Sequence, residues 1–355
     1  MTAQQLPLRV GLLGFGLGGR VFHAPLITAC PGLALSAVIT RDPARRAAAH
    51  AAYPAAAILD SPDQLWERSR DFDLVVVATP NQSHVALART ALQRGLPVVV
   101  DKPLAATAAE AVDLIELARA QGRMLTVFQN RRWDGDFLTV RKLLDRDALG
   151  RVHRFESRFE RWSPAPRAGW RESADPHAAG GLLYDLGAHL IDQALQLFGP
   201  VRTVYAELDH RRAGVVVDDD AFVALHHASG TRSQLWMSKV AAQRAPRFRL
   251  LGERAAFVKY GLDGQEPAMA VGAIPGSPGW GEEPAERWGL LGEEPTAQQV
   301  PTEAGCYLRF YEAVVAALTT GAPPPVDPGD AVRALEIIAA ARTSAERSEV
   351  VALRS

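Results

Sequence analysis

The first 128 residues alternate between short apolar runs and helical stretches, and this alternation narrows the fold more than any other feature. Strands that are apolar throughout and separated by helices are typical of a parallel sheet covered on both faces. We therefore expect residues 1–128 to form a doubly wound α/β domain. The apolar runs lie at residues 8–13, 34–39, 74–78, 97–100 and 124–128, and helical stretches at 43–52, 82–94 and 107–121.

The first apolar run ends in the motif Gly14-x-Gly16-x-x-Gly19, which opens the next helical stretch. Glycines at this spacing allow a tight turn, close approach of the backbone to a pyrophosphate, and close packing of helix on strand. The free N–H groups of the helix start also favour phosphate. The motif predicts that Gly14, Phe15, Gly16 and Gly19 bind a dinucleotide; the alternative is a glycine-rich turn with no ligand.

The end of the second apolar run bears on the choice of cofactor. NAD-binding domains place an acidic residue there to accept a hydrogen bond from the ribose 2′-hydroxyl. Here the run ends on Thr40 and Arg41, and a guanidinium pairs well with a 2′-phosphate. Asp42 is late for that role and resembles a helix N-cap, while Arg45 and Arg46 follow one turn later. We expect NADP in preference to NAD; the alternative is that Arg41 is an ordinary surface arginine.

The second half of the chain has a different pattern. From about residue 151 the apolar residues alternate in period two, which predicts an antiparallel sheet with one solvated face. We expect a second domain over residues 129–355, an α/β domain with a large, mainly antiparallel open sheet whose last helices pack back on the first domain. Further strands are expected near 221–227, 232–239, 246–251 and 255–260, an irregular stretch over 264–305, and helices over 307–319 and 330–346.

Composition excludes several classes of protein. The 355 residues carry a net charge of −1, which argues against nucleic acid or a membrane surface as a partner. The N-terminus lacks the features of a signal peptide, so a cytoplasmic location is expected. Cys30 and Cys306 form neither a disulfide framework nor a metal-ligand pair, and no metal is expected.

A lysine stands at the end of the apolar run 97–100, in the sequence Asp101-Lys102-Pro103. The strands of an open α/β sheet present their carboxyl ends to ligands, so Lys102 is a candidate site residue. The alternative is a solvated strand end.

A second cluster of polar residues lies in the apolar run 180–199, where Asp185, His189 and Asp192 occur at helical spacing. Asp185 and His189 are four residues apart, so a regular helix places them on one face. A histidine beside a carboxylate is a proton carrier near neutral pH. The alternative is a packed core histidine.

Taken together, the glycine motif, the Asp-Lys-Pro at 101–103 and the Asp-Leu-Gly-Ala-His at 185–189 resemble the Gfo/Idh/MocA oxidoreductase family. Within it, the stretches GFGLGGRVFHAPLI, FQNRRWDGDF, YDLGAHLIDQALQLFG and GSPGWGEE resemble the branch that contains NADP-dependent scyllo-inositol dehydrogenases. The resemblance implies a Rossmann domain, a C-terminal α/β domain whose open sheet forms an oligomer interface, and a cis peptide before Pro103. It also implies that Lys102 and His189 face the nicotinamide with Asp185 beside them. The family's usual acid before the lysine is Glu, and here it is Asp101.

These features predict a dehydrogenase that interconverts a secondary alcohol and a ketone on a sugar or cyclitol. His189 would act as the base, Lys102 as the cation that polarises the oxygen, and Asp185 as the orienting acid. Alternatives are a cofactor-sensing regulatory protein and a redox-neutral glycoside-processing enzyme. Further cofactor contacts are expected from Thr79, Pro80, Asn81 and His84, and substrate contacts from Asn130, Arg131, Trp133, Trp170 and Arg171.

The antiparallel strands also predict assembly. Val204, Ala206 and Leu208 alternate with Thr203 and Tyr205, so apolar side chains fall on both faces of the sheet. A monomer covers one face with helices and leaves the other in water. We therefore expect a homodimer or homotetramer built sheet to sheet.

Overall fold

The computed structural model describes residues 6–166 and 169–353 of the chain. These residues form two compact units that interleave along the sequence. The first unit takes in the described part of Met1–Asn130 together with Gln265–Trp280 and Cys306–Val332, and the second takes in Arg131–Gly264, Gly281–Gly305 and the described part of Arg333–Ser355. None of the helices in these described ranges is long and apolar enough to cross a membrane.

The first unit contains a parallel six-stranded sheet in the order β3-β2-β1-β4-β5-β6. Its central strands are buried on both faces, with Val10, Leu12, Val75 and Val99 fully inaccessible to solvent. The doubly wound Rossmann fold expected from the alternating pattern is therefore confirmed. The strands are β1 (Leu8–Leu13), β2 (Leu33–Ile39), β3 (Ala57–Leu59), β4 (Leu74–Val77), β5 (Val98–Asp101) and β6 (Leu125–Phe128).

Short helices cover this sheet, and α1 packs against α9 while α4 packs against α5. The Thr107 hydroxyl accepts a hydrogen bond from the Glu110 N–H, and Glu110 accepts one from the Thr107 N–H, so the predicted capping box forms. The helices are η1 (Gly18–His23), α1 (Ala24–Ala29), α2 (Pro43–Ala52), α3 (Pro62–Glu67), η2 (Ser69–Asp71), η3 (Asn81–Ser83), α4 (His84–Gln93), α5 (Ala108–Ala120), α8 (Gln265–Ala270) and α9 (Leu308–Thr320).

The second unit is built on a nine-stranded sheet in the order β14-β13-β12-β11-β7-β10-β9-β8-β15. Neighbouring strands are antiparallel except for β7 and β10, which pair in parallel, so the predicted mainly antiparallel sheet is confirmed. The strands are β7 (Val152–Glu160), β8 (Val201–Asp209), β9 (Asp220–His227), β10 (Arg232–Ser238), β11 (Phe248–Gly252), β12 (Ala256–Lys259), β13 (Gly289–Gly292), β14 (Gln298–Val300) and β15 (Val351–Ala352).

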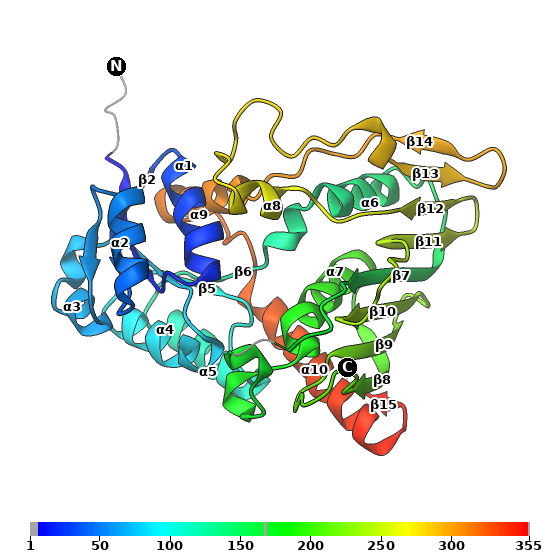
Figure 1. The fold of residues 1–355 in the computed structure, drawn as a ribbon, viewed down its shortest axis with the longest axis horizontal. Helices are drawn as coiled ribbons and strands as arrows, with labels where there is room; N and C mark the ends of the chain where they lie inside the picture. Colours follow the sequence, from blue (N-terminus) through cyan, green and yellow to red (C-terminus); the bar gives the residue numbers. More distant parts are fainter. Residues whose placement is uncertain (1–5, 167–168, 354–355) are drawn as a thin grey trace. The chain divides into compact units, whose positions relative to one another are not determined.

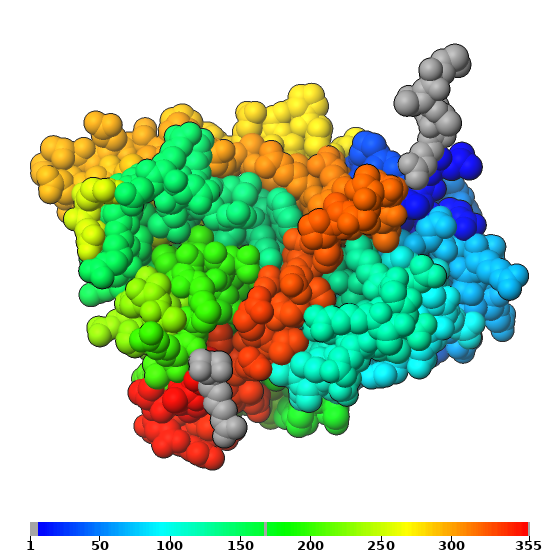
Figure 2. Space-filling view, turned by 180° about the vertical axis from the view of Figure 1, so that it is seen from behind, coloured from blue at the N-terminus to red at the C-terminus, as the bar shows by residue number. Residues whose placement is uncertain are grey.

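One face of this sheet is covered within the unit. Helix α7 lies against β7 and β10 (Figure 1). The Ser344 hydroxyl of α10 accepts a hydrogen bond from the Ala206 N–H of β8 at 2.9 Å. The C-terminal part of α10, coloured red, lies at the surface in Figure 2. The remaining helices are η4 (Asn130–Trp133), α6 (Gly135–Asp145), η5 (Trp170–Glu172), η6 (Pro176–Ala178), η7 (Leu183–Gly187), α7 (Ala188–Phe198), η8 (Ala285–Arg287) and α10 (Pro328–Arg347).

The expectation of an irregular stretch over residues 264–305 is wrong. This stretch contains α8 and the hairpin of β13 and β14, whose strands extend the large sheet beyond β12. Leu290 and Leu291 pair with Val258 and Phe257 of β12, so the hairpin is held by partners about 30 residues earlier. Glycine at both ends of β13 conceals this pattern, because glycine has low strand propensity.

Candidate active site

The predicted cofactor residues of the first unit lie along one edge of its parallel sheet. Gly14 follows β1, Thr40 follows β2, Thr79 follows the end of β4 and Lys102 follows β5. Strands β2, β1, β4 and β5 are consecutive neighbours and run in the same direction, so their carboxyl ends share this edge. Open α/β sheets bind their ligands outside this edge.

The glycine motif forms a turn that admits no side chain at two of its positions. Gly14 has φ +101°, and a Cβ atom there would lie 2.5 Å from the Ala78 carbonyl oxygen. A Cβ atom on Gly19 would lie 2.0 Å from the Gly14 carbonyl oxygen. Both glycines are therefore required by the backbone, and the turn has the geometry that a dinucleotide pyrophosphate needs.

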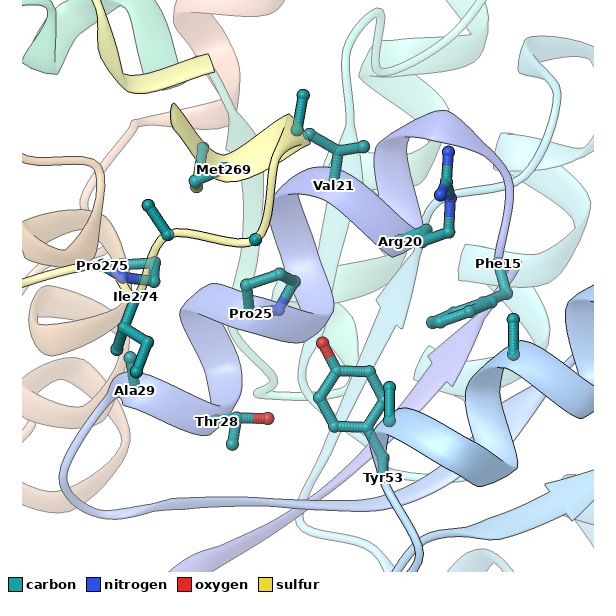
Figure 3. Close-up of a pocket in the computed structure, with 15 residues that line it drawn as sticks. Phe15, Arg20, Val21, Pro25, Thr28, Ala29, Tyr53, Met269, Ile274 and Pro275 are labelled. Carbon is teal, nitrogen blue, oxygen red and sulfur yellow. The ribbon is translucent and has the colours of Figure 1, made fainter. Parts of the chain in front are cut away.

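Phe15 belongs to this turn, but its side chain points elsewhere. The ring is 2% exposed and meets Tyr53 edge-on, with ring centroids 6.2 Å apart. It lines an apolar pocket of about 500 Å³ between α1, α2 and the segment after α8 (Figure 3). Thr40, Thr79 and Lys102 do not line this pocket.

Some charged residues after β2 are engaged in local contacts, and others are positioned where they could meet a cofactor. The Asp42 carboxylate accepts a hydrogen bond from the Arg45 N–H at 2.9 Å and caps α2, as predicted. The Arg46 guanidinium pairs with Asp60. Arg41 is exposed, and a Cβ atom on Gly16 would lie 3.8 Å from a terminal nitrogen of Arg45. Of these arginines, Arg45 is thus the one whose guanidinium lies by the glycine turn.

His84 ties together the backbone after two neighbouring strands. Its ring nitrogens lie 2.9 Å from the Thr79 carbonyl oxygen and 2.8 Å from the Pro103 carbonyl oxygen. Burial lowers the pKa of His84, and the neutral ring donates one hydrogen bond only. The sequence suggested that His84 runs along the cofactor; in the structure its buried ring lies between the backbone carbonyls of Thr79 and Pro103 and donates to one of them. The Lys102–Pro103 peptide is cis, as the resemblance implied.

The acid and the histidine of the second unit follow one another through an irregular helical turn. Asp185 lies in η7, which is a π-helical turn, and His189 lies in the first turn of α7 and is 6% exposed. The spacing argument assumed a regular α-helix, and the π turn shifts Asp185 from the position that it would have there.

Asp218 anchors this turn, and no motif identified it. One carboxylate oxygen accepts a hydrogen bond from the Leu183 N–H at 2.7 Å, and the Asp218 carbonyl accepts one from the Leu182 N–H at 2.9 Å. Burial raises the pKa of Asp218. The sequence does carry one signal for it, which is the run of three acids at 218–220 beside a predicted strand. An acid at such a position is rarely buried unless it has a hydrogen-bond or charge partner.

Arg171 is brought together with Asp185. Its guanidinium nitrogen lies 3.4 Å from an Asp185 carboxylate oxygen, and its guanidinium carbon lies 4.4 Å from the centroid of the Trp170 ring. The next residue, Glu172, pairs with Arg212 and Lys239, which fixes the segment to the sheet. Arg171 thus lies beside Asp185, with Trp170 packed against its guanidinium.

The sequence indicated substrate contacts for the segment at 130–133, and in the structure its two arginines form buried ion pairs. Arg131 pairs with Asp134 and its guanidinium lies 5.2 Å from the centre of the Phe159 ring. Arg132, which no motif identified, donates hydrogen bonds to both carboxylate oxygens of Asp192 at 2.8 and 2.5 Å. Asp192 is thus engaged in an ion pair that attaches α7 to this segment. The other two predicted members, Asn130 and Trp133, are buried and partly buried respectively.

Comparison with known proteins agrees with this architecture. Residues 8–129 match the Gfo/Idh/MocA description "Oxidoreductase family, NAD-binding Rossmann fold", and residues 141–353 match "Oxidoreductase family, C-terminal alpha/beta domain". The chain is 37% identical to the uncharacterized oxidoreductase YdgJ of Escherichia coli, over 98% of this chain and 99% of that protein. It is 33% identical to the scyllo-inositol 2-dehydrogenase (NADP(+)) IolW of Bacillus subtilis, over 98% of this chain and 96% of that protein.

The solved structures give the same result. The structure of yvaA from Bacillus subtilis has a TM-score of 0.93 and 31% identity, covering 98% of this chain and 99% of its own. The family match covers both the Rossmann unit with its glycine turn and the sheet-based unit with Asp185 and His189. The chain belongs to the Gfo/Idh/MocA family of NAD(P)-dependent oxidoreductases.

Proposed function

We propose that the protein is an NADP-dependent dehydrogenase that interconverts a secondary alcohol and a ketone on a sugar or cyclitol. The observation that carries this proposal is the position of Lys102. It follows β5 at the carboxyl edge of the sheet that also presents the glycine turn at Gly14. A cation at this edge is suited to an oxygen that gains negative charge as a hydride leaves the neighbouring carbon.

The proton chemistry falls to three side chains. NADP, when bound, supplies the hydride acceptor. His189 takes the hydroxyl proton as general base, and the Lys102 ammonium polarises the oxygen and stabilises its alkoxide character. Asp185 orients the substrate or the histidine and favours the charged imidazole.

NADP is preferred over NAD because of the residues after β2. The Asp42 carboxylate caps α2 and is engaged by the Arg45 N–H, so it is poorly placed to receive a ribose hydroxyl. Arg41 is exposed and the Arg45 guanidinium lies by Gly16, which suits a 2′-phosphate. The name of the relative IolW specifies NADP(+), which supports the same choice.

The side chains beside Asp185 support this substrate class. The stacked pair of Trp170 and Arg171 offers an apolar face and a hydrogen-bond donor, a combination that suits the faces and hydroxyls of a sugar or cyclitol ring. The relative IolW is named as a dehydrogenase of scyllo-inositol, which makes cyclitols the first compounds to test.

We further propose that the enzyme assembles through the uncovered face of its nine-stranded sheet. Phe222 and Trp236 lie on this face with ring centroids 5.0 Å apart, and the Arg158 guanidinium lies 4.1 Å from the Trp236 ring centre. Both aromatic side chains are only partly buried within the chain. A sheet face with aromatic residues and arginine has the composition of a protein interface.

A screen of NADPH formation tests the proposed activity. The purified protein is incubated with NADP⁺ and a panel of cyclitols and aldoses, and the absorbance of NADPH is followed. We expect NADP⁺ to be reduced to NADPH in the presence of scyllo-inositol or a related polyol. If no compound in the panel gave NADPH, the proposal of a dehydrogenase would be contradicted. Nucleotide that stays bound through purification, with no net NADPH formation but with product appearing, would favour the redox-neutral alternative.

A further inference from the structure

A buried histidine of the first unit contacts the acid that precedes Lys102. His23 is the last residue of η1, is 0% exposed, and packs on Phe128 with ring centroids 4.4 Å apart. Its Nδ1 atom lies 2.6 Å from the hydroxyl of Tyr311, which is fully buried in α9. Neither His23 nor Tyr311 belongs to the motifs that identify the cofactor and catalytic residues.

The other ring nitrogen of His23 is directed to Asp101. His23 Nε2 lies 3.7 Å from Asp101 Oδ2 and has no hydrogen-bond partner among the described residues. Burial raises the pKa of Tyr311 well above its usual value, with Asp101 and Cys30 adding to the effect, so its hydroxyl keeps its proton. The arrangement is consistent when Tyr311 donates to Nδ1 and the proton on Nε2 faces the carboxylate.

Asp101 transmits this contact to the backbone of Lys102. Its Oδ1 atom accepts a hydrogen bond from the Lys102 N–H at 2.8 Å. Burial opposes ionisation of Asp101, but His23, with a smaller effect of Lys102, outweighs it and lowers the pKa of Asp101 below its usual value. The carboxylate is thus charged, with one oxygen facing His23 and the other on the Lys102 amide.

Space on the remaining side of the carboxylate is closed by η1. A Cβ atom on Gly18 would lie 2.7 Å from Asp101 Oδ2. Gly18 has no positive φ, so an alanine there is compatible with the backbone, and the displaced group would be the carboxylate. The position of Asp101 is therefore set by the start of η1, by His23, and by the Lys102 amide.

We propose that Tyr311, His23 and Asp101 form a positioning chain that holds the backbone of Lys102 in place for catalysis. The proposal rests on the proposed function, since it assigns these residues an effect through the catalytic lysine. None of the three is assigned a contact with substrate. A displacement of about 1 Å in a catalytic group costs about 10²-fold in rate, so a loosened chain slows the chemical step.

Tyr311→Phe tests the chain at the end distant from Lys102. It removes one hydroxyl, leaves the ring, and takes from His23 the hydrogen bond that orients it. Tyr260→Phe is the matched control, because Tyr260 is 59% exposed and lies in the second unit. Single-turnover formation of NADPH is measured with enzyme in excess over scyllo-inositol at saturating NADP⁺, and NADP⁺ affinity is measured by fluorescence.

The rate and the amplitude of the single turnover separate positioning from a loss of folded protein. We expect the rate constant of Tyr311→Phe to fall about tenfold or more, with amplitude and NADP⁺ affinity within about twofold of wild type. A merely structural role would lower the amplitude and leave the rate constant unchanged, and that result would overturn the proposal. A rate constant equal to that of Tyr260→Phe would overturn it as well.

Gly18→Ala tests the other end of the chain and serves if Tyr311→Phe fails to fold. It keeps the Tyr311 hydroxyl and His23 but displaces the Asp101 carboxylate. Because Gly18 also lies in the glycine turn, NADP⁺ affinity is measured as well, and we expect the rate constant to fall as it does in Tyr311→Phe with NADP⁺ affinity within about twofold of wild type. A normal rate constant in Gly18→Ala would show that the effect does not pass through Asp101, and the chain would be refuted.

Failure of the proposed function has a different signature. Wild-type protein that forms no NADPH from scyllo-inositol or any other polyol contradicts the dehydrogenase itself. Wild-type activity combined with an unchanged rate constant in either variant contradicts only the positioning chain.

Discussion

The ion pair of Arg132 and Asp192 yields a prediction whose size can be worked out from its geometry. The guanidinium makes two hydrogen bonds to the carboxylate, at 2.8 and 2.5 Å, and the two residues are 8% and 2% exposed. Replacing Arg132 by Met removes the cation and leaves the carboxylate buried. Breaking a buried pair in this way costs about 3–5 kcal/mol of unfolding free energy.

This loss is large enough to measure by two methods. For a unit of this size about 1 kcal/mol corresponds to about 2–4 °C in Tm, so Arg132→Met is expected to lower Tm by about 6–20 °C. Urea unfolding followed by circular dichroism gives the free energy, and a thermal scan gives Tm. Arg151→Met is the matched control: its ion pair with Glu253 has side chains that are 76% and 52% exposed, and its loss is expected to cost less than about 1 kcal/mol.

A double variant tests the cause of the loss. Arg132→Met combined with Asp192→Leu removes both charges and is expected to recover most of the stability, because no buried charge remains. Two results would refute the reasoning: a loss in Arg132→Met no larger than in Arg151→Met, or a double variant as unstable as the single one.

The remaining predictions concern the cofactor, catalysis, pH and assembly. The wild-type enzyme is expected to prefer NADP over NAD by about tenfold or more in kcat/KM, which corresponds to about 1.4 kcal/mol. Arg41→Ala is expected to lower this preference. Arg46→Ala is the control and is expected to leave it unchanged, because Arg46 is engaged in an ion pair with Asp60. His189→Ala and Lys102→Ala are each expected to lower kcat by about 10²–10⁴-fold, while NADP⁺ affinity changes less for His189; near-normal turnover would remove the residue from the mechanism. Burial opposes ionisation of Glu172, but Lys239 and Arg212 outweigh it and lower the pKa of Glu172 in the folded protein. The ionised carboxylate therefore stabilises the fold at pH values above its pKa in the unfolded chain, and this stabilisation is lost as the pH falls through its pKa in the folded protein. Glu172→Gln should therefore weaken the pH dependence of the unfolding free energy on the acid side, as measured by urea unfolding at several pH values. An unchanged pH dependence would contradict a stabilising role for the ion pairs of Glu172. Light scattering should give a multiple of 38.3 kDa, and a monomer mass would contradict assembly through the sheet.

Elements with a strong local signal were predictable from the sequence. Helix α2 has the expected bounds, because Asp42 caps it, Pro43 opens it and the alanines continue it. The capping box of α5 is equally local. The hairpin of β13 and β14 was missed, because short strands rich in glycine and glutamine depend on pairing with β12 rather than on their own propensity.

The candidate site shows the same division. The glycine turn, Lys102, Asp185 and His189 are recognisable because each stands in a short motif. Their supports are not, since each depends on a partner remote in the sequence: Tyr311 is 288 residues from His23. Asp218 is 35 residues from Leu183, and Arg132 is 60 residues from Asp192. A buried polar residue is informative only once its partner is known, and the fold alone supplies that partner.

The π-helical turn at Leu183–Gly187 has a consequence for how this segment tolerates insertion and deletion. A π turn holds one residue more than an α turn, so deleting a single residue would turn it into regular helix. Everything before the deletion would then rotate by about 100° relative to α7, because each residue of an α-helix accounts for that angle. Asp185 and its neighbour Arg171 would leave their present direction while His189 kept its own. A substitution in this turn changes one side chain. A one-residue deletion changes the direction of the whole segment that carries Asp185. Libraries that vary substrate preference here should therefore hold the length of the segment constant.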